Sequence, residues 1–211
     1  MLTFIRSKTM TNMMKKFGAV ITALLLSACS TMNNNQAAPE RFSELHFDNK
    51  APIALNVKQI DIKSEFTPSF TRPNVEHLFP VSIEKTATTW AKERLEDADL
   101  SSNRIAEFII QDASVTESEV KAQQFLQKDS LKYHANLKVT LKVIDAKSTA
   151  QTTVEAYREL TMPIDTNIED KEQHWNDMVI KLFQSFDEHM QLNTEKYLDM
   201  YIKNNNSVTV F

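Results

Sequence analysis

The stretch LKYHANLKVTLKV, residues 131–143, alternates apolar and polar side chains at every position. A strict two-residue period is typical of a β-strand that has one face in the core and the other in water. The residues DAKS, 145–148, predict a turn, and apolar side chains recur at even-numbered positions over residues 150–162. The sequence therefore predicts an antiparallel hairpin.

Three further elements are predicted before this hairpin. Residues 53–62 alternate with a change of phase after Lys58, as a β-bulge would produce, and predict one strand. Residues 104–117 are rich in β-forming side chains and predict another. Between them, apolar side chains recur at helical spacing over residues 83–95 behind Ser82, which is a suitable N-cap.

A second helix is predicted after the hairpin. Thr166 and Glu169 have the spacing of a capping box, and the helical pattern behind them extends over residues 168–202, with a break expected near residues 193–194. The resulting order is β-α-β-β-β-α. It predicts an α+β fold in which a mainly antiparallel four-stranded sheet carries two helices on one face.

The N-terminus has the layout of an export signal. Lys15 and Lys16 precede the apolar residues 17–28, which are too few for a transmembrane helix of about 20 residues. This run ends in LSAC, residues 26–29, which resembles the lipobox of bacterial lipoproteins. The alternative is an ordinary secretory signal followed by a coincidental cysteine. Four methionines are candidate start residues: Met1, Met10, Met13 and Met14.

The resemblance to a lipobox implies cleavage after Ala28 and attachment of a diacylglyceryl group and an N-acyl chain to Cys29. Cys29 is the only cysteine, so it has no partner for an intramolecular disulfide, and acylation gives it a role. In lipoproteins of this kind an aspartate after the cysteine favours the inner membrane, whereas this chain has Ser30. We therefore expect a lipid anchor in the outer membrane, on its periplasmic face.

The chain divides into four predicted regions. These are a signal peptide (1–28), a lipidated N-terminus with a flexible tether (29–50), a single α+β domain (51–203) and a C-terminal tail (204–211).

Without the signal the chain carries 24 − 4 = 20 basic and 28 acidic residues, a net charge of −8, which argues against a nucleic-acid partner. The only glycine, Gly18, lies in the signal, so glycine-dependent phosphate loops and the nucleophile elbow are excluded.

Three blocks of sequence carry a family resemblance: RPNVEHLFP at 72–80, WAKERL at 90–95 and DASV at 112–115. Together they resemble a family of short envelope lipoproteins, mostly alphaproteobacterial, whose members have no established activity. The resemblance spans roughly residues 50–195. Family members usually have a glycine after the first helix, and this chain lacks it. The order of elements also resembles, at the level of fold, outer-membrane lipoproteins that assist lipid or lipopolysaccharide transport.

The block at 72–80 is the candidate binding site. Two prolines stiffen a loop that combines charged, amide, imidazole and large apolar side chains, which suits recognition of a partner. The residues proposed to contact that partner are Arg72, Asn74, Glu76, His77 and Phe79. The alternative is structural: Val75, Leu78 and Phe79 plug the end of the sheet, while Arg72 and Glu76 cap backbone groups.

Catalytic and metal-binding residues are not predicted. Only Asp170, His174 and Asp177 share helical spacing, and a zinc site would need further ligands. We therefore expect a non-enzymatic accessory or scaffold subunit of an envelope assembly, with no cofactor beyond the lipid on Cys29. Its expected partners are the membrane, through the anchor, and an envelope protein.

Two alternatives remain open. One is a lipid-binding module that assists lipid or lipopolysaccharide transport and holds a lipid ligand in a cavity lined by Trp90, Trp175 and Phe186. The other is a periplasmic hydrolase, which would need clustered histidine, serine or carboxylate side chains in a cleft.

Overall fold

The structure, a computed structural model, describes residues 42–123 and 127–203. The predicted signal peptide, Ala28, Cys29 and the tail over residues 204–211 lie outside the described residues. Within the described part of the chain, no helix is long and apolar enough to cross a membrane.

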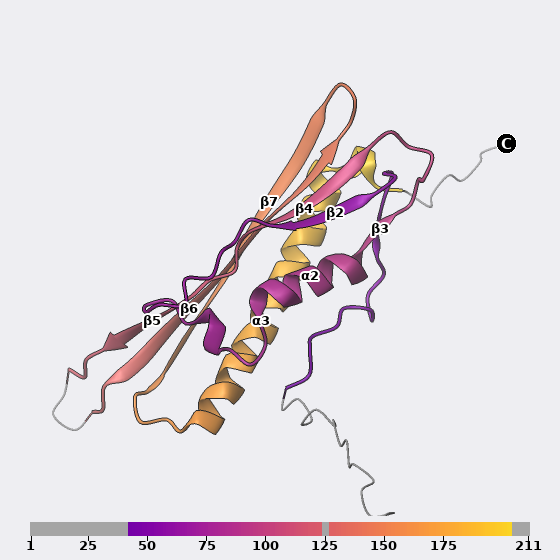
Figure 1. The fold of residues 1–211 in the computed structure, drawn as a ribbon. Helices are drawn as coiled ribbons and strands as arrows, with labels where there is room; N and C mark the ends of the chain where they lie inside the picture. Colours follow the sequence, from indigo (N-terminus) through magenta and orange to yellow (C-terminus); the bar gives the residue numbers. More distant parts are fainter. Residues whose placement is uncertain (1–41, 124–126, 204–211) are drawn as a thin grey trace, which may run out of the picture. The chain divides into compact units, whose positions relative to one another are not determined.

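The predicted hairpin is confirmed; β6 is the central strand of the main sheet and β7 forms one of its edges (Figure 1). Strand β6 (Ser130–Ile144) pairs antiparallel with β7 (Thr149–Pro163) along its whole length. The Asp145 amide donates to the Ser148 carbonyl at 2.9 Å, which closes the turn where the sequence places it.

The other edge of β6 pairs with two shorter antiparallel strands in succession, β4 (Ile105–Asp112) and β5 (Val115–Val120). The single strand predicted for this region is therefore wrong. The Asp112 carboxylate accepts hydrogen bonds from the Ser114 amide at 3.0 Å and from the Asn136 side chain at 2.8 Å. These bonds occupy the break between the two strands, and the bulge itself lies just before it, where the register of β4 on β6 shifts between Ile110 and Asp112.

The predicted strand over residues 53–62 is also two strands, and they belong to different sheets. Strand β2 (Ile60–Ser64) is parallel to β4, and β1 (Ile53–Leu55) is parallel to β3 (Leu95–Asp97) in a small separate sheet. The α+β class with two helices is confirmed, but the main sheet is mixed and has five strands in place of four. A helix connects β2 to β4, and such a crossover leaves the two strands parallel.

Helix α2 (Ile83–Arg94) begins as predicted, with the Ser82 hydroxyl accepting from the Lys85 amide at 3.3 Å. Helix α3 (Ile168–Tyr197) begins where predicted but differs from the prediction in its N-cap and ends five residues earlier. Its N-cap is Asn167, whose side chain accepts from the Asp170 amide at 2.8 Å, so the predicted capping box at Thr166 and Glu169 is wrong.

The expected break near residues 193–194 is absent, and α3 continues for 30 residues. Thr194 is buried, and its hydroxyl donates to the Met190 carbonyl one turn earlier at 2.7 Å. This bond satisfies the polar group inside the helix, so the threonine does not interrupt it. Two short 3₁₀ helices complete the described elements, η1 (Glu76–Leu78) and η2 (Asp199–Tyr201).

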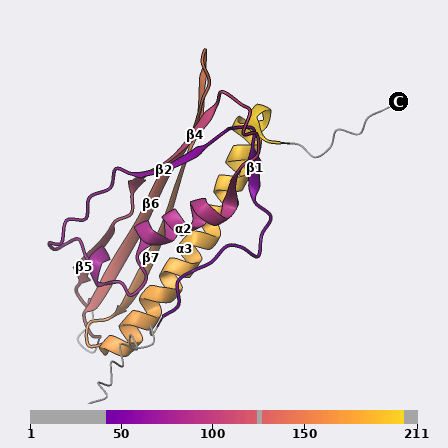
Figure 2. The same cartoon turned by 45° about the vertical axis from the view of Figure 1, so that its right-hand side comes forward.

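Both helices cover the same face of the main sheet (Figure 2). Helix α3 packs mainly on β7, whereas α2 lies over β2 and β4. The apolar side chains of the central strands point toward the helices and are buried with the aromatic side chains of α2 and α3. The core therefore lies between one sheet face and one helical layer.

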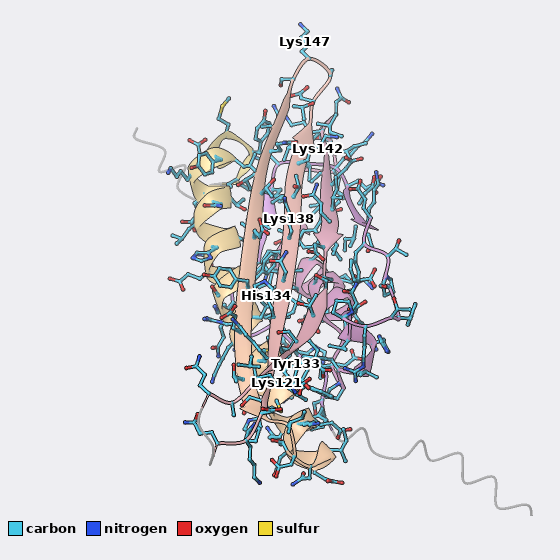
Figure 3. The ribbon with its side chains drawn as sticks, turned by 90° about the vertical axis from the view of Figure 1, so that its left-hand side faces the viewer. Lys121, Tyr133, His134, Lys138, Lys142 and Lys147 are labelled. Carbon is cyan, nitrogen blue, oxygen red and sulfur yellow. The ribbon has the colours of Figure 1, made fainter. Side chains whose placement is uncertain are left out.

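The opposite sheet face carries polar side chains, among them His134, Lys138 and Lys142 along β6 (Figure 3). Glu107 pairs with Lys142 at 3.1 Å and with Lys63, and Glu159 pairs with Lys132 at 2.9 Å. These ion pairs connect neighbouring strands across this face, as on a solvated sheet surface.

Residues 42–50, which the sequence analysis assigns to the tether, pack across α2 and α3; we call this segment the strap. The Phe47 amide donates to the Glu93 carboxylate of α2 at 2.6 Å, and the Phe47 ring lies 5.7 Å from the Phe183 ring of α3. Near the end of the strap, Lys50 pairs with Asp187. The described end of the tether is therefore docked on the helices.

Candidate functional site

Part of the 72–80 loop continues the edge of the main sheet. The Val75 amide donates to the Val115 carbonyl, and the Glu117 amide donates to the Pro73 carbonyl, each at 2.8 Å. Asn74 forms an antiparallel bridge with Thr116. The proline-bracketed block is therefore fixed to β5 by backbone hydrogen bonds.

Before this block the chain leaves the sheet. Strand β2 ends at Ser64, and the Glu65 amide still donates to the Ile110 carbonyl at 2.8 Å. Residues 66–72 then pass outside the sheet beside Ala113, which lies between β4 and β5, and pairing resumes at Pro73. This detour leaves a gap in the edge next to the start of α2.

Two charged residues of the loop are held by β5. The Arg72 guanidinium forms an ion pair with Glu117. The Glu76 carboxylate accepts from the Ser69 amide at 3.1 Å and from the Val115 amide at 3.5 Å. Glu76 therefore fastens the detour to the sheet, which is the kind of backbone capping that the structural alternative describes.

Phe79 belongs to a buried aromatic cluster. Its ring stacks on Trp175 of α3, with 4.9 Å between centroids and 17° between planes. Tyr133 of β6 meets both rings edge-on, at 6.3 Å from Phe79 and 5.5 Å from Trp175. Burial raises the pKa of the Tyr133 hydroxyl. The cluster connects the loop to the sheet and to α3, so Phe79 anchors the loop on its core-facing side.

His77 lies on the outer side of the loop with Phe70, a residue that the sequence analysis did not select. Their rings are 5.5 Å apart, and the Phe70 side chain is 66% exposed. Phe70 also has a φ of 54°, a left-handed conformation that is unusual for a bulky residue. The sequence feature that could have identified Phe70 is its position between Pro68 and Pro73. An aromatic residue there belongs to neither a strand nor a helix that could bury it.

A hollow of about 210 Å³ opens beside this pair of rings. Its apolar part is formed by Phe66, Phe79, Ile83 and Ala113, and its remaining lining comes from the detour, the loop and the start of α2. The full lining is Phe66, Pro68, Phe70, Glu76, His77, Phe79, Ser82, Ile83, Glu84 and Ala113. Of the five predicted contact residues, Glu76, His77 and Phe79 border the hollow.

The polar part of the hollow is acidic. Glu76 and Glu84 both line it, and Glu84 accepts a hydrogen bond from the Ser64 hydroxyl. Among residues 42–123 and 127–203, no lysine or arginine forms an ion pair with either carboxylate. The hollow thus combines an apolar floor with two carboxylates that lack a cationic partner there.

The three residues proposed to line a lipid cavity are packed into the core. The Trp90 ring stacks on Phe108 at 5.6 Å and meets Phe186 edge-on at 5.1 Å, while Trp175 belongs to the aromatic cluster. All three are buried. They fill the space between the sheet and the helices, where the lipid-binding alternative places an acyl chain.

The described residues include no group of three or more His, Cys, Asp and Glu side chains arranged to hold a metal ion. Of the helical triad noted in the sequence, Asp177 accepts from the Gln173 side chain at 3.1 Å. His174 and Asp170 lie in the first two turns of the same helix.

Comparison with known proteins gives likeness to solved structures alone, because no family model and no curated protein matches the chain. One similar structure is a minor lipoprotein from Acinetobacter baumannii, at 12% identity over 71% of this chain and 98% of that one, with a TM-score of 0.37. Another is rare lipoprotein B from Shewanella oneidensis, at 12% identity over 65% and 98%, with a TM-score of 0.32. A third, a DUF330 protein from Xanthomonas campestris, has 9% identity over 73% and 93% and a TM-score of 0.30.

Proposed function

We propose that this protein is a lipoprotein anchored in the outer membrane, facing the periplasm, and that it acts as a non-enzymatic accessory or scaffold subunit of an envelope assembly. The observation that carries the proposal is the LSAC motif at residues 26–29, which ends in the only cysteine of the chain. Two or more acyl chains give stable membrane anchoring, so acylation of Cys29 would hold the protein permanently at the membrane.

The lipid and the docked strap together would set the position of the domain. Twelve residues, 30–41, separate Cys29 from Phe42, and a flexible chain of that length would span about 20 Å. The folded body would therefore stay close to the membrane surface, where other anchored proteins are present at high effective concentration.

The 72–80 loop supports a binding role because it is already ordered. Backbone pairing with β5 and the aromatic cluster under Phe79 fix its conformation. A surface that is rigid before binding loses little conformational entropy when a partner docks, which favours affinity. We place the partner contact on the outer side of this loop, at His77 and the neighbouring Phe70.

Metabolic labelling with an alkyne analogue of palmitate tests the anchor. The wild-type protein should be labelled and should sediment with outer-membrane fractions, whereas Cys29→Ala should lose the label. Ser30→Asp, which keeps the cysteine, should move the labelled protein toward inner-membrane fractions. An unlabelled wild-type protein would contradict the lipoprotein assignment, and an unchanged distribution of Ser30→Asp would contradict the role given to Ser30.

Crosslinking in intact cells tests the scaffold role. The wild type is compared with Phe70→Ala/His77→Ala, which changes exposed rings and spares the buried Phe79. Both proteins must first be shown to be acylated and equally stable. A partner that is captured by the wild type and lost from the variant supports the proposal and identifies the assembly. Identical partners in both would place the contact elsewhere on the domain.

A further inference from the structure

The hollow beside Phe70 exists because the edge of the sheet is interrupted at one point. Strand β2 stops at Ser64, the chain makes its detour over residues 66–72, and β4 ends at Asp112 after a bulge between Ile110 and Asp112. Ile83, the first residue of α2, closes the inner side. The interruption therefore opens a path from solvent to buried apolar side chains at the end of the core.

The size and lining of the hollow suit one large apolar side chain. An engineered apolar cavity of about 150 Å³ binds benzene, so about 210 Å³ has room for a phenyl or leucyl group. Phe66, Phe79 and Ile83 would contact such a group from three sides. Its burial would contribute the apolar anchor that protein interfaces commonly have at their centre.

The two carboxylates specify what should flank that side chain. Glu76 and Glu84 line the same hollow and have no lysine or arginine partner in the described part of the chain. A partner that carried a cation next to its apolar anchor would supply the missing charge, and complementary charges favour both encounter and specificity. An acidic or uncharged segment would lack this match.

Phe70 provides an independent indication that this surface is used. A left-handed conformation is sterically unfavourable for an aromatic residue, because its Cβ lies too close to the following carbonyl oxygen. Here that conformation holds a mostly exposed ring beside His77 at the entrance of the hollow. Because the ring is not used to fill the core, its retention in a strained position is a feature typical of functional sites.

We infer that this hollow accepts one large apolar side chain of a partner protein, flanked in sequence by lysine or arginine. The inference rests on the proposed scaffold function and specifies the chemistry of the partner. Phe66, Phe79 and Ile83 bind the apolar side chain, Glu76 and Glu84 pair with the flanking cations, and Phe70 and His77 cover the bound segment.

The test uses the acylated full-length mature protein in lipid nanodiscs and three fluorescent pentapeptides. Their central residues are Lys-Phe-Lys, Glu-Phe-Glu and Lys-Ala-Lys, and binding is measured by fluorescence anisotropy with empty nanodiscs as the lipid control. The Lys-Phe-Lys peptide should bind at least ten-fold more tightly than either of the others. A version with a photoreactive phenylalanine should crosslink within residues 66–70 or 76–84.

Two variants locate the binding energy. Glu84→Gln removes one carboxylate and should weaken the Lys-Phe-Lys peptide about two- to five-fold, the range that one partly exposed ion pair provides. Glu96→Gln, which removes an exposed charge outside the hollow, is the matched control and should leave binding unchanged. Phe70→Gly should weaken binding at least five-fold without unfolding the protein, because glycine adopts a φ of 54° readily.

Several results would overturn the inference. Equal affinity for the Lys-Phe-Lys and Glu-Phe-Glu peptides would show that flanking cations are not recognised. Crosslinks outside the hollow would show that the peptide binds elsewhere on the protein. Binding to empty nanodiscs alone would assign the peptide to the lipid. If the peptides fail while in-cell crosslinking still detects a partner that depends on Phe70 and His77, the scaffold function stands and only the partner chemistry is wrong.

Discussion

Asp187 of α3 accepts a hydrogen bond from the Nε of Arg94 of α2 at 2.9 Å, and both side chains are almost fully buried, at 3% and 1% exposure. Trp90 donates its Nε1 to the same carboxylate at 2.8 Å, and Lys50 of the strap pairs with it. Burial alone would raise the pKa of Asp187, but these hydrogen bonds outweigh it and hold the pKa below the ordinary aspartate value. One carboxylate thus joins both helices and the strap.

Asp187→Asn should therefore be strongly destabilising. It leaves the Arg94 guanidinium buried without its counter-charge, and breaking a buried pair in this way costs about 3–5 kcal/mol. Urea unfolding monitored by tryptophan fluorescence measures the change. Glu188→Gln, at the adjacent exposed position, should change the free energy of unfolding by less than about 0.5 kcal/mol. A loss below about 1 kcal/mol for Asp187→Asn would show that the carboxylate charge does not hold the layer together.

Docking of the strap should depend on pH. The hydrogen bond to Glu93 raises the pKa of His46, with Nδ1 and the carboxylate 2.7 Å apart. Burial alone would raise the pKa of Glu93, but hydrogen bonds from His46 and the Phe47 amide lower it. The histidine contribution is therefore fully present below its unfolded pKa and is lost as pH rises through the folded pKa. The glutamate contribution is lost as pH falls through its own folded pKa.

The protection factors of the strap amides against hydrogen exchange, corrected for the intrinsic pH dependence of exchange, should accordingly be highest between those two pKa values. Glu44 and Asp48 also favour the charged histidine, while Lys85 pairs with Glu44 nearby. In His46→Gln the alkaline loss of protection should disappear, while the acidic loss should remain. An alkaline loss of the same size in that variant would assign the pH dependence to another group.

Alternation made the hairpin predictable, because a period of two fixes both the strands and their buried face. Alternation carries no information on strand direction, so the parallel pairing of β2 with β4 was missed. The helix that separates these two strands in sequence was the feature that pointed to parallel pairing. The division into β4 and β5 involves the hydrogen bond from Asn136 to Asp112, two residues that are 24 positions apart in sequence and meet only in three dimensions.

The candidate site was predicted in part for similar reasons. The two prolines marked the 72–80 loop, and Glu76, His77 and Phe79 do border one hollow. Phe70 and Glu84 were missed because one is defined by its backbone angle and the other by the approach of a helix to the detour. A pattern of residue types along the chain records neither property.

Phe70→Gly should be more stable than Phe70→Ala. Both remove the exposed ring, but alanine keeps the steric cost of a positive φ, whereas glycine avoids it. Glycine also gains more conformational entropy on unfolding, so the net difference should be about 0.5–1 kcal/mol in its favour. Parallel urea titrations of the two variants give this difference directly. A more stable alanine variant would show that the left-handed conformation is not kept in solution.

Phe79→Ala should separate the anchoring role of this loop from its binding role. Truncating a buried aromatic side chain costs about 3–5 kcal/mol, and here it also removes the stack on Trp175. Leu78→Ala, at the neighbouring and largely exposed position, should cost less than about 0.5 kcal/mol. Urea unfolding of both variants measures this contrast. Equal stabilities would mean that the aromatic cluster does not hold the loop, and the rigidity on which partner docking depends would then need another source.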